Sequence, residues 1–259
     1  MKLAMNVLCV LLFLTSINIK SVFAEEKTTA FVTICFDDAH RSVFTHALPV
    51  FQQYGLAATA YVPTIGIDEK PYWHMSWKQI IALQDSGWEI GSHSHTHASM
   101  TTLSPEKIDE ELRTSQSILA EHGIEAKTFA APLGDNNDET IDGAKKYFIG
   151  QRGTERVRGH QLDLSLNELN VDSYDISGIQ LWYDYPLVKI KGLVDLAIEK
   201  KQWAVFYLHA ISEGQTEDKD YKFDAQVLGM LVSYLKDLQN EGKIKVVTIA
   251  EFLEQRKKK

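Results

Sequence analysis

Cysteine is scarce in this chain of 259 residues, which contains Cys9 and Cys35 and no other cysteine. We expect Cys9 to be removed with an N-terminal leader, so one thiol remains and no internal disulfide can form. Cys35 lies in the apolar run FVTICF, where a thiol is usually buried and unreactive. The fold must therefore be stabilised by its hydrophobic core, for which a 44% hydrophobic composition is sufficient.

Long apolar runs are absent after the first 24 residues. Those residues, MKLAMNVLCVLLFLTSINIKSVFA, combine Lys2, a short apolar stretch and small residues placed for cleavage, with no acidic residue. This pattern predicts a secretory signal peptide, residues 1–24, cut after Ala24. The alternative is an uncleaved membrane anchor, which needs about 20 apolar residues. We therefore expect a secreted, periplasmic or cell-envelope protein with no stable membrane anchor after cleavage.

Positively charged residues are fewer than negatively charged ones, 27 Lys and Arg against 35 Asp and Glu. The net charge of −8 becomes −10 when Lys2 and Lys20 leave with the leader. Such a chain has no basic footprint for DNA or RNA, so nucleic acid is not expected as a partner. The terminal run Lys257 to Lys259 is interpreted as a solvated tail. No linker, repeat or low-complexity stretch divides residues 25–259, so we expect a single domain.

Strands and helices are predicted to alternate along this domain. Apolar runs predict strands at residues 29–38, 57–63, 88–93, 128–134, 147–153, 166–171, 202–210 and 243–249. Helical periodicity with Ser, Pro and Gly boundary residues predicts helices at residues 42–54, 76–87, 104–123, 138–147, 186–201 and 223–242. This alternation is typical of a parallel sheet, and about seven repeats indicate an α/β barrel.

Polar motifs follow four of the predicted strands: FDD, GSHSHTH, FAAPLG and YLHA. In a β/α barrel these strand ends meet on one face, where active sites lie. His93 and His97, four residues apart, could bind one cation there, with Asp37 or Asp38 as an oxygen ligand. The other aspartate and His209 would then be available as a base and an acid for hydrolysis. The alternative is a polar loop without a ligand.

The order FDD, SGWEIGSHSHTH, FAAPLG and LH resembles the polysaccharide deacetylase family (NodB-homology domain, carbohydrate esterase family four) over residues 29–252. The resemblance implies a distorted barrel of about seven strands, a NodB-like (β/α)7-type fold. It also implies a divalent metal held by Asp38, His93 and His97. Zinc is the expected ion, and Co, Ni, Mn or Fe would also suit these ligands. His95, between the two histidines, is expected to be exposed or to support a ligand.

The same resemblance assigns roles around the metal. It implies that Asp37 is the catalytic base and His209 the acid. The hydroxyl of Ser94 would brace the histidine loop. The third motif would contribute Pro132 and the backbone N–H of Leu133 as an oxyanion donor, and Leu208 would line the acetyl pocket.

The sequence departs from the family pattern at several places. Ala39 replaces the glycine of the first motif, and Leu133 stands where an aromatic is usual. Ala130 takes the place of the arginine that pairs with the base, and Arg152 in GQRG is a candidate substitute. In DSYDI, either Asp172 or Asp175 could orient the acid histidine, and Asp175 is preferred.

The predicted function is removal of N-acetyl groups from an acetylated polysaccharide or oligosaccharide by metal-activated water, with an Asp base and a His acid. An alternative is an O-acetyl esterase acting on acetylated xylan. A second alternative is an inactive secreted carbohydrate-binding relative, favoured by the missing arginine. Trp182 is a candidate for stacking on a sugar ring. The sequence does not predict the oligomeric state or the particular glycan.

Overall fold

The computed structural model describes residues 29–69, 72–154, 156–158, 161–163, 166–213 and 222–258. The predicted cleavage site after Ala24 lies outside these residues, as does Lys259. Within the described part of the chain, no helix is both long enough and apolar enough to cross a membrane.

A parallel sheet forms the centre of the molecule, and each of its strand pairs runs in the same direction. In spatial order its strands are β5 (Gly150–Arg152), β4 (Thr128–Ala130), β3 (Glu89–Ser92), β2 (Thr59–Val62), β1 (Ala30–Phe36), β9 (Trp203–Leu208) and β8 (Ile179–Gln180). The eighth strand, β12 (Ile244–Val246), pairs with the first residues of β1.

The two edges of this sheet are joined by one segment, residues 173–180, which is irregular at first and ends in β8. At one edge, the N–H groups of Gln151 and Gly153 donate to the carbonyls of Ser173 and Ile176, at 2.7 and 2.8 Å. At the other edge, β8 pairs with β9. The sheet therefore curls into a distorted barrel, as the sequence predicted.

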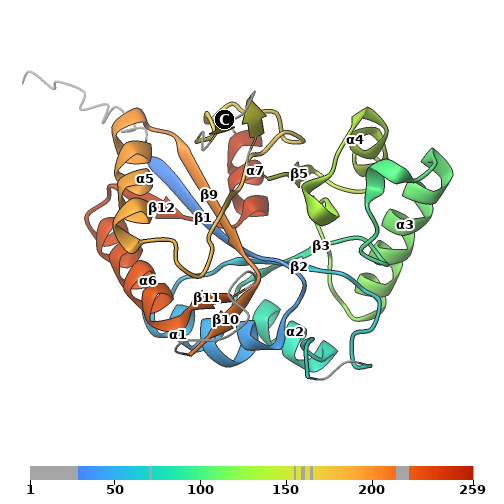
Figure 1. The fold of residues 1–259 in the computed structure, drawn as a ribbon, viewed down its shortest axis with the longest axis horizontal. Coiled ribbons are helices and arrows are strands. Elements are labelled where there is room, and N and C mark those ends of the chain that lie inside the picture. Colours follow the sequence, from blue (N-terminus) through green and yellow to red (C-terminus); the bar gives the residue numbers. More distant parts are fainter. Residues whose placement is uncertain are drawn as a thin grey trace, which may run out of the picture.

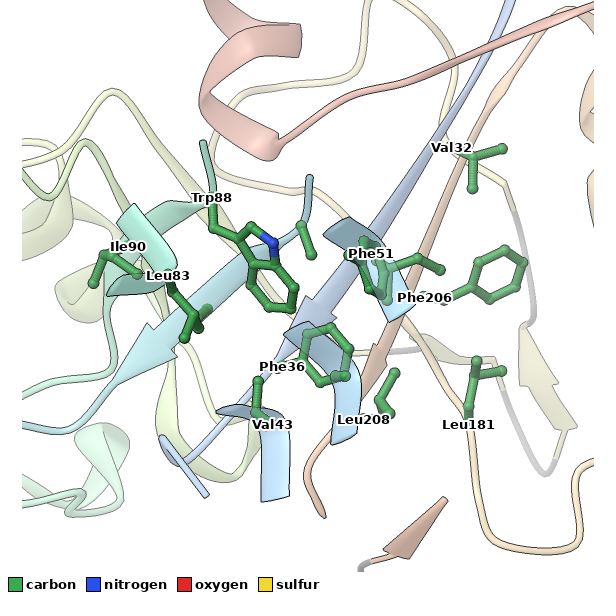
Figure 2. Close-up of a cluster of buried hydrophobic side chains, with 14 of the residues drawn as sticks. Val32, Phe36, Val43, Phe51, Leu83, Trp88, Ile90, Leu181, Phe206 and Leu208 are labelled. Carbon is green, nitrogen blue, oxygen red and sulfur yellow. The ribbon is translucent and has the colours of Figure 1, made fainter. Parts of the chain in front are cut away.

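Strand alternation divides the apolar side chains into two cores, because successive residues of a strand face opposite sides. The outer core packs residues such as Phe36, Phe51 and Trp88 between the sheet and the surrounding helices. The rings of Phe36 and Trp88 stack at 5.2 Å, and Figure 2 shows them together with Phe51. The helices concerned are α1 (Leu48–Tyr54), α2 (Trp77–Asp85), α3 (Pro105–Glu121), α5 (Leu187–Lys200) and α6 (Ala225–Asn240), which lie around the sheet in Figure 1.

The inner core fills the barrel and is closed by α7 (Ile249–Lys257). Phe252 of α7 stacks on Trp203 at 3.8 Å and meets Phe31 edge-on at 5.1 Å. Both partners lie at the start of a strand, so α7 covers the N-terminal end of the barrel. The opposite, carboxyl end is left for the polar motifs.

Helix starts follow the sequence signals closely. Ser76 accepts a hydrogen bond from the backbone N–H of Gln79, whose side chain in turn accepts from the N–H of Ser76, a capping box. Ser104 caps α3 with Pro105 in its first turn, and Asp224 caps α6. Each such cap is worth about 1 kcal/mol.

Two expectations for the chain path are wrong. Residues 166–171 form a turn with a single bridge from Asn167 to Trp203, not a strand. The buried Asn167 side chain explains this, because its amide bonds to the backbone N–H and carbonyl of Ser177, at 2.9 and 2.8 Å. The last predicted strand is also shorter than expected, because Thr248 caps α7, a helix that was not predicted from the sequence.

The remaining described elements are short. They are the π-helical turn η1 (Val43–Ala47), the 3-10 turns η2 (Met100–Thr102) and η3 (Pro132–Gly134), the helix α4 (Asp138–Ala144), and the strand pairs β6 (Arg156–Arg158) with β7 (Gln161–Asp163) and β10 (Ala210–Ser212) with β11 (Lys222–Asp224).

Candidate metal centre and active site

The carboxyl ends of the strands surround a cavity of about 550 Å³. Alternation along each strand explains the inward-facing side chains: Cys35 and Val205 belong to the inner core, so Asp37 and His209, two and four residues later, come to the same side. The cavity is lined by Asp37, Asp38, His93, His97, Ala131, Leu133, Gly134, Arg152, Thr154, Gln180, Trp182, Tyr207 and His209. The structure therefore brings both aspartates and three of the predicted histidines together.

Asp38, His93 and His97 form a cluster suited to a metal ion. The Nε2 atoms of His93 and His97 lie 3.4 and 3.2 Å from Oδ1 of Asp38. Ligand atoms bound tetrahedrally about 2.0–2.2 Å from one ion would lie about 3.3–3.6 Å apart. Both the spacing and the two-imidazole, one-carboxylate donor set fit a divalent cation.

His93 is held in the orientation that such a ligand needs. Its Nδ1 atom lies 2.7 Å from the carbonyl oxygen of Ala130, and the residue is buried. A carbonyl oxygen only accepts hydrogen bonds, so Nδ1 carries a proton, and Nε2 is the nitrogen that faces Asp38. Metal-binding histidines are commonly oriented in this way.

The histidine loop is braced by two side chains. The hydroxyl of Ser94 accepts the N–H of His97 at 3.0 Å, which is the bracing contact that the resemblance implied. Glu111 of α3 accepts the N–H groups of His95 and Thr96, at 3.0 and 2.7 Å, and also the Thr96 hydroxyl at 2.6 Å. Glu111 was not predicted as a site residue, because a helix residue that far along the chain carries no local signal of this contact.

His95 takes no part in the three-residue cluster. Its Nδ1 instead shares a hydrogen bond of 2.9 Å with the hydroxyl of Thr64, in the loop after β2. Its carbonyl oxygen accepts the N–H of Ile65 at 2.9 Å. The residue thus links two loops beside the cavity.

Backbone strain is concentrated at this end of the barrel. Seven described non-glycine residues have positive φ, and five of them lie in the loops around the cavity: Asp38 (69°), Ala39 (50°), Ser94 (65°), His97 (61°) and Leu133 (60°). Such values are uncommon for L-residues and cluster at functional sites. The value at Ala39 also explains why glycine suits this position.

The charges of the cluster reinforce one another. Burial acts to raise the pKa of Asp38, but hydrogen bonding to His93 and His97 outweighs it and lowers that pKa below its ordinary value. Hydrogen bonding to Asp38 raises the pKa of His97. An anionic carboxylate at this point therefore attracts a cation, either a proton on the imidazole or a metal ion.

Asp37 faces Arg152 in the interior of the barrel. The Arg152 guanidinium donates to Oδ2 of Asp37, and both residues are buried. The guanidinium also lies over the rings of Tyr207 and Tyr61, at 4.6 and 5.2 Å. Burial acts to lower the pKa of Arg152, but the charge of Asp37 raises it above its ordinary value. Oδ1 of Asp37 is buried and has no hydrogen-bond partner among the described residues.

His209 and two apolar side chains occupy other parts of the cavity wall. His209 follows β9, is half-buried, and lies edge-on to Tyr207 at 6.0 Å. The Tyr207 hydroxyl donates to the side-chain oxygen of Gln180 at 2.9 Å. Leu133 and Trp182 are exposed at 67% and 44%, so they form a rim open to solvent.

Three predicted site residues do not line the cavity. Leu208 is fully buried in the outer core, because it precedes the inward-facing His209 and points to the other side of the sheet (Figure 2). Pro132 is buried beneath the turn that exposes Leu133. Asp175 is exposed on a turn, where its N–H donates to the carbonyl of Asp172 at 3.0 Å.

Comparisons with known proteins agree with this arrangement. The sequence model of the family described as polysaccharide deacetylase matches residues 24–149. YxkH of Bacillus subtilis is 28% identical over 116 residues, which cover 44% of this chain and 41% of that protein. The poly-beta-1,6-N-acetyl-D-glucosamine N-deacetylase of Staphylococcus aureus is 26% identical over 128 residues, 44% of each chain. The chain thus spans less than half the length of these relatives.

Among solved structures, the Xyl-CE4 domain of a multidomain xylanase from the hindgut metagenome of Trinervitermes trinervoides superimposes with a TM-score of 0.56. The two share 18% identity, and the match covers 88% of this chain and 91% of that one. At this identity the likeness concerns the fold, and it extends over nearly the whole barrel.

Proposed function

This chain belongs to the polysaccharide deacetylase family, and on that basis we propose that it is a metal-dependent hydrolase that removes N-acetyl groups from an acetylated glycan. The observation that carries the proposal is the position of the Asp38, His93 and His97 cluster in the same cavity as Asp37 and His209. A metal site beside a carboxylate and an imidazole can supply the activated water, the base and the acid for hydrolysis of an amide.

Asp38, His93 and His97 are the residues that would hold the metal. When bound there, a divalent cation supplies Lewis acidity toward water and toward the acetyl carbonyl. The protein contributes the fixed positions of these ligands, through the Ala130 carbonyl behind His93 and the Glu111 carboxylate behind the loop.

Asp37 is the proposed base. Its Oδ2 accepts from Arg152, while its buried Oδ1 remains available to take a proton from the attacking water. The water oxygen forms a bond to the acetyl carbon, and negative charge develops on the carbonyl oxygen. We assign the backbone N–H of Leu133, on the cavity wall, as a donor to that oxygen.

His209 is the proposed acid. The bond between the acetyl carbon and the sugar nitrogen breaks only if the nitrogen receives a proton and leaves as a neutral amine. His209 lies in the same cavity as Asp37, so a base and an acid can act on a single bound group. The products are acetate and a free amino sugar.

The choice of an N-acetylated glycan rests on two supports. The Staphylococcus aureus relative is an N-deacetylase of poly-beta-1,6-N-acetyl-D-glucosamine. The exposed Trp182 indole on the cavity rim offers a flat surface on which a sugar ring can stack. Secretion to the envelope or beyond is also part of the proposal. It rests on residues 1–24 and is tested by finding Glu25 at the N-terminus of the exported protein.

Acetate release provides the test. Purified protein loaded with Zn, Co, Ni, Mn or Fe is incubated with β-1,6- and β-1,4-linked N-acetylglucosamine oligomers, peptidoglycan and acetylxylan, and products are weighed by mass spectrometry. Replacement of an acetyl group by hydrogen on an amino sugar, seen as the corresponding loss of mass, supports the proposal. Release from acetylxylan alone indicates an O-acetyl esterase, and binding without release from any substrate indicates an inactive carbohydrate-binding protein.

A further inference from the structure

Ala130 and Arg152 are direct neighbours across two paired strands. In the parallel pairing of β4 with β5, the Cα of Ala130 is in register with the Cα of Arg152. Ala130 belongs to the inner core and Arg152 lines the cavity, so both side chains are on the inner face of the barrel. Ala130 stands where the family pattern places an arginine, and the arginine of this chain is one strand away.

Arg152 reaches from this position to Asp37 at the end of β1. Its guanidinium donates to Oδ2 of Asp37 and to the carbonyl of Gly153, the latter at 3.2 Å. The rings of Tyr207 and Tyr61 lie beside it, and only 1% of the side chain is exposed. Both terminal nitrogens of the buried guanidinium are thus held in place, whereas its Nε has no hydrogen-bond partner among the described residues.

The neighbouring residues are small where the Arg152 side chain passes. A Cβ atom added to Gly178 would lie 3.0 Å from Cδ of Arg152 and 3.0 Å from the Tyr207 ring. Ala130 is completely buried, so a long side chain there would compete with Arg152 for the same interior space. Gly178 and Ala130 together leave room for an arginine from β5 and not for a second one from β4.

We propose that Arg152 is the positioning residue for the base Asp37. In this barrel the arginine that pairs with the base is therefore supplied by β5, and not by the third motif on β4. The inference rests on the proposed function. Arg152 fixes one carboxylate oxygen of Asp37 and balances its buried charge, which leaves the other oxygen directed to the reaction. The alanine in the third motif is then a relocation of the arginine, not a sign of lost activity.

Moving the arginine back tests this proposal. The variants are Arg152→Met, Arg152→Lys, Ala130→Arg, and the double variant Ala130→Arg with Arg152→Ala. Arg256→Met is the matched control, because Arg256 also bonds through its guanidinium, to the Val171 carbonyl and the Ser173 hydroxyl, but on α7 at the other end of the barrel. For each protein, Tm, metal content, kcat and KM are measured.

The expected pattern separates positioning from general stability. Arg152→Met should lower Tm by on the order of 10 °C, because Asp37 is left buried without its partner. It should also lower kcat about 100-fold with bound metal and KM little changed, since a displaced base affects the reaction and not binding. Arg152→Lys should have a Tm and a kcat between those of the wild-type protein and Arg152→Met. The double variant should recover at least 10-fold in kcat and part of the Tm, whereas Ala130→Arg alone, with two arginines in one space, should be the least stable.

Two results would overturn the inference. One is an Arg152→Met variant with the wild-type kcat. The other is a folded, metal-loaded double variant that recovers neither kcat nor Tm. Arg256→Met should lower Tm and leave kcat unchanged. If the wild-type protein releases no acetate, the proposed function fails. The Tm series then still decides whether an arginine at either position pairs with Asp37.

Discussion

The imidazole Nδ1 of His93 lies 2.7 Å from the carbonyl oxygen of Ala130. This contact joins β4 to the histidine loop and fixes the tautomer that presents Nε2 to Asp38. The same residue, Ala130, is the register neighbour of Arg152. One position on β4 thus supports the metal ligand through its backbone and makes room for the arginine through its small side chain.

The two histidines His93 and His95 should respond differently to substitution. His93→Ala removes a ligand, so the protein should lose its metal and its activity. His95→Ala should retain the metal, because the His95 side chain bonds to Thr64 and is outside the cluster. Metal analysis after gel filtration measures both. Equal metal loss in the two variants would contradict the assigned ligand set.

Glu111 should tune the metal affinity without touching the metal. Glu111→Ala frees the backbone N–H groups of His95 and Thr96, so the loop that carries His97 loses its brace. Loss of such outer support typically weakens metal binding about 10–100-fold, which competition with a chelator can measure. Glu110→Ala, which removes the exposed partner of Lys107, is the control and should keep the wild-type affinity. An unchanged affinity in Glu111→Ala would exclude the bracing role.

Cys35 should be unreactive in the folded protein. Burial raises the pKa of its thiol well above the ordinary value, so the thiol stays protonated at pH 8. Because the pKa is raised on folding, this thiol's contribution to stability is complete below its unfolded pKa of about 8.5 and declines as the pH rises further. Labelling with a chromogenic disulfide, in protein lacking Cys9, should be slow in buffer and fast in denaturant. Rapid labelling of the native protein would contradict the buried position.

Ala39→Gly should stabilise the protein slightly. Ala39 adopts φ of 50°, which costs an L-residue about 1–2 kcal/mol, while the flexibility of glycine costs about 0.5–1 kcal/mol. The net gain should raise Tm by about 1–4 °C, as calorimetry can show. Ala47→Gly, in a turn with ordinary helical φ, should lower Tm instead. A lower Tm for Ala39→Gly would mean that the Ala39 methyl contributes more to packing than its backbone costs.

The sequence predicted those features that depend on local patterns. Ser76 and Ser104 mark helix starts by their capping chemistry, and period-two alternation brings Asp37 and His209 to the inner face. Prediction from the sequence failed where tertiary contacts determine the local structure. The apolar residues of 166–171 resemble a strand, but the hydrogen bonds of buried Asn167 fold them into a turn.

The same distinction between local patterns and tertiary contacts applies to the candidate site. The metal cluster was predictable from motif order and strand ends. Leu208 was misplaced because the motif names it beside His209, although adjacent residues of a strand point to opposite faces. Arg152 was predicted only as a candidate partner of Asp37, since pairing across a barrel depends on register and on neighbouring side-chain size.

Asp37→Asn separates the role of Asp37 as a base from metal binding. The substitution keeps the shape of the side chain and removes its basicity, so Asp38, His93 and His97 should bind metal as in the wild-type protein. Acetate release and metal content are measured on the same samples with an N-acetylglucosamine oligomer. We predict full metal content with kcat reduced at least about 1000-fold. A metal-loaded Asp37→Asn variant with the wild-type rate would contradict it.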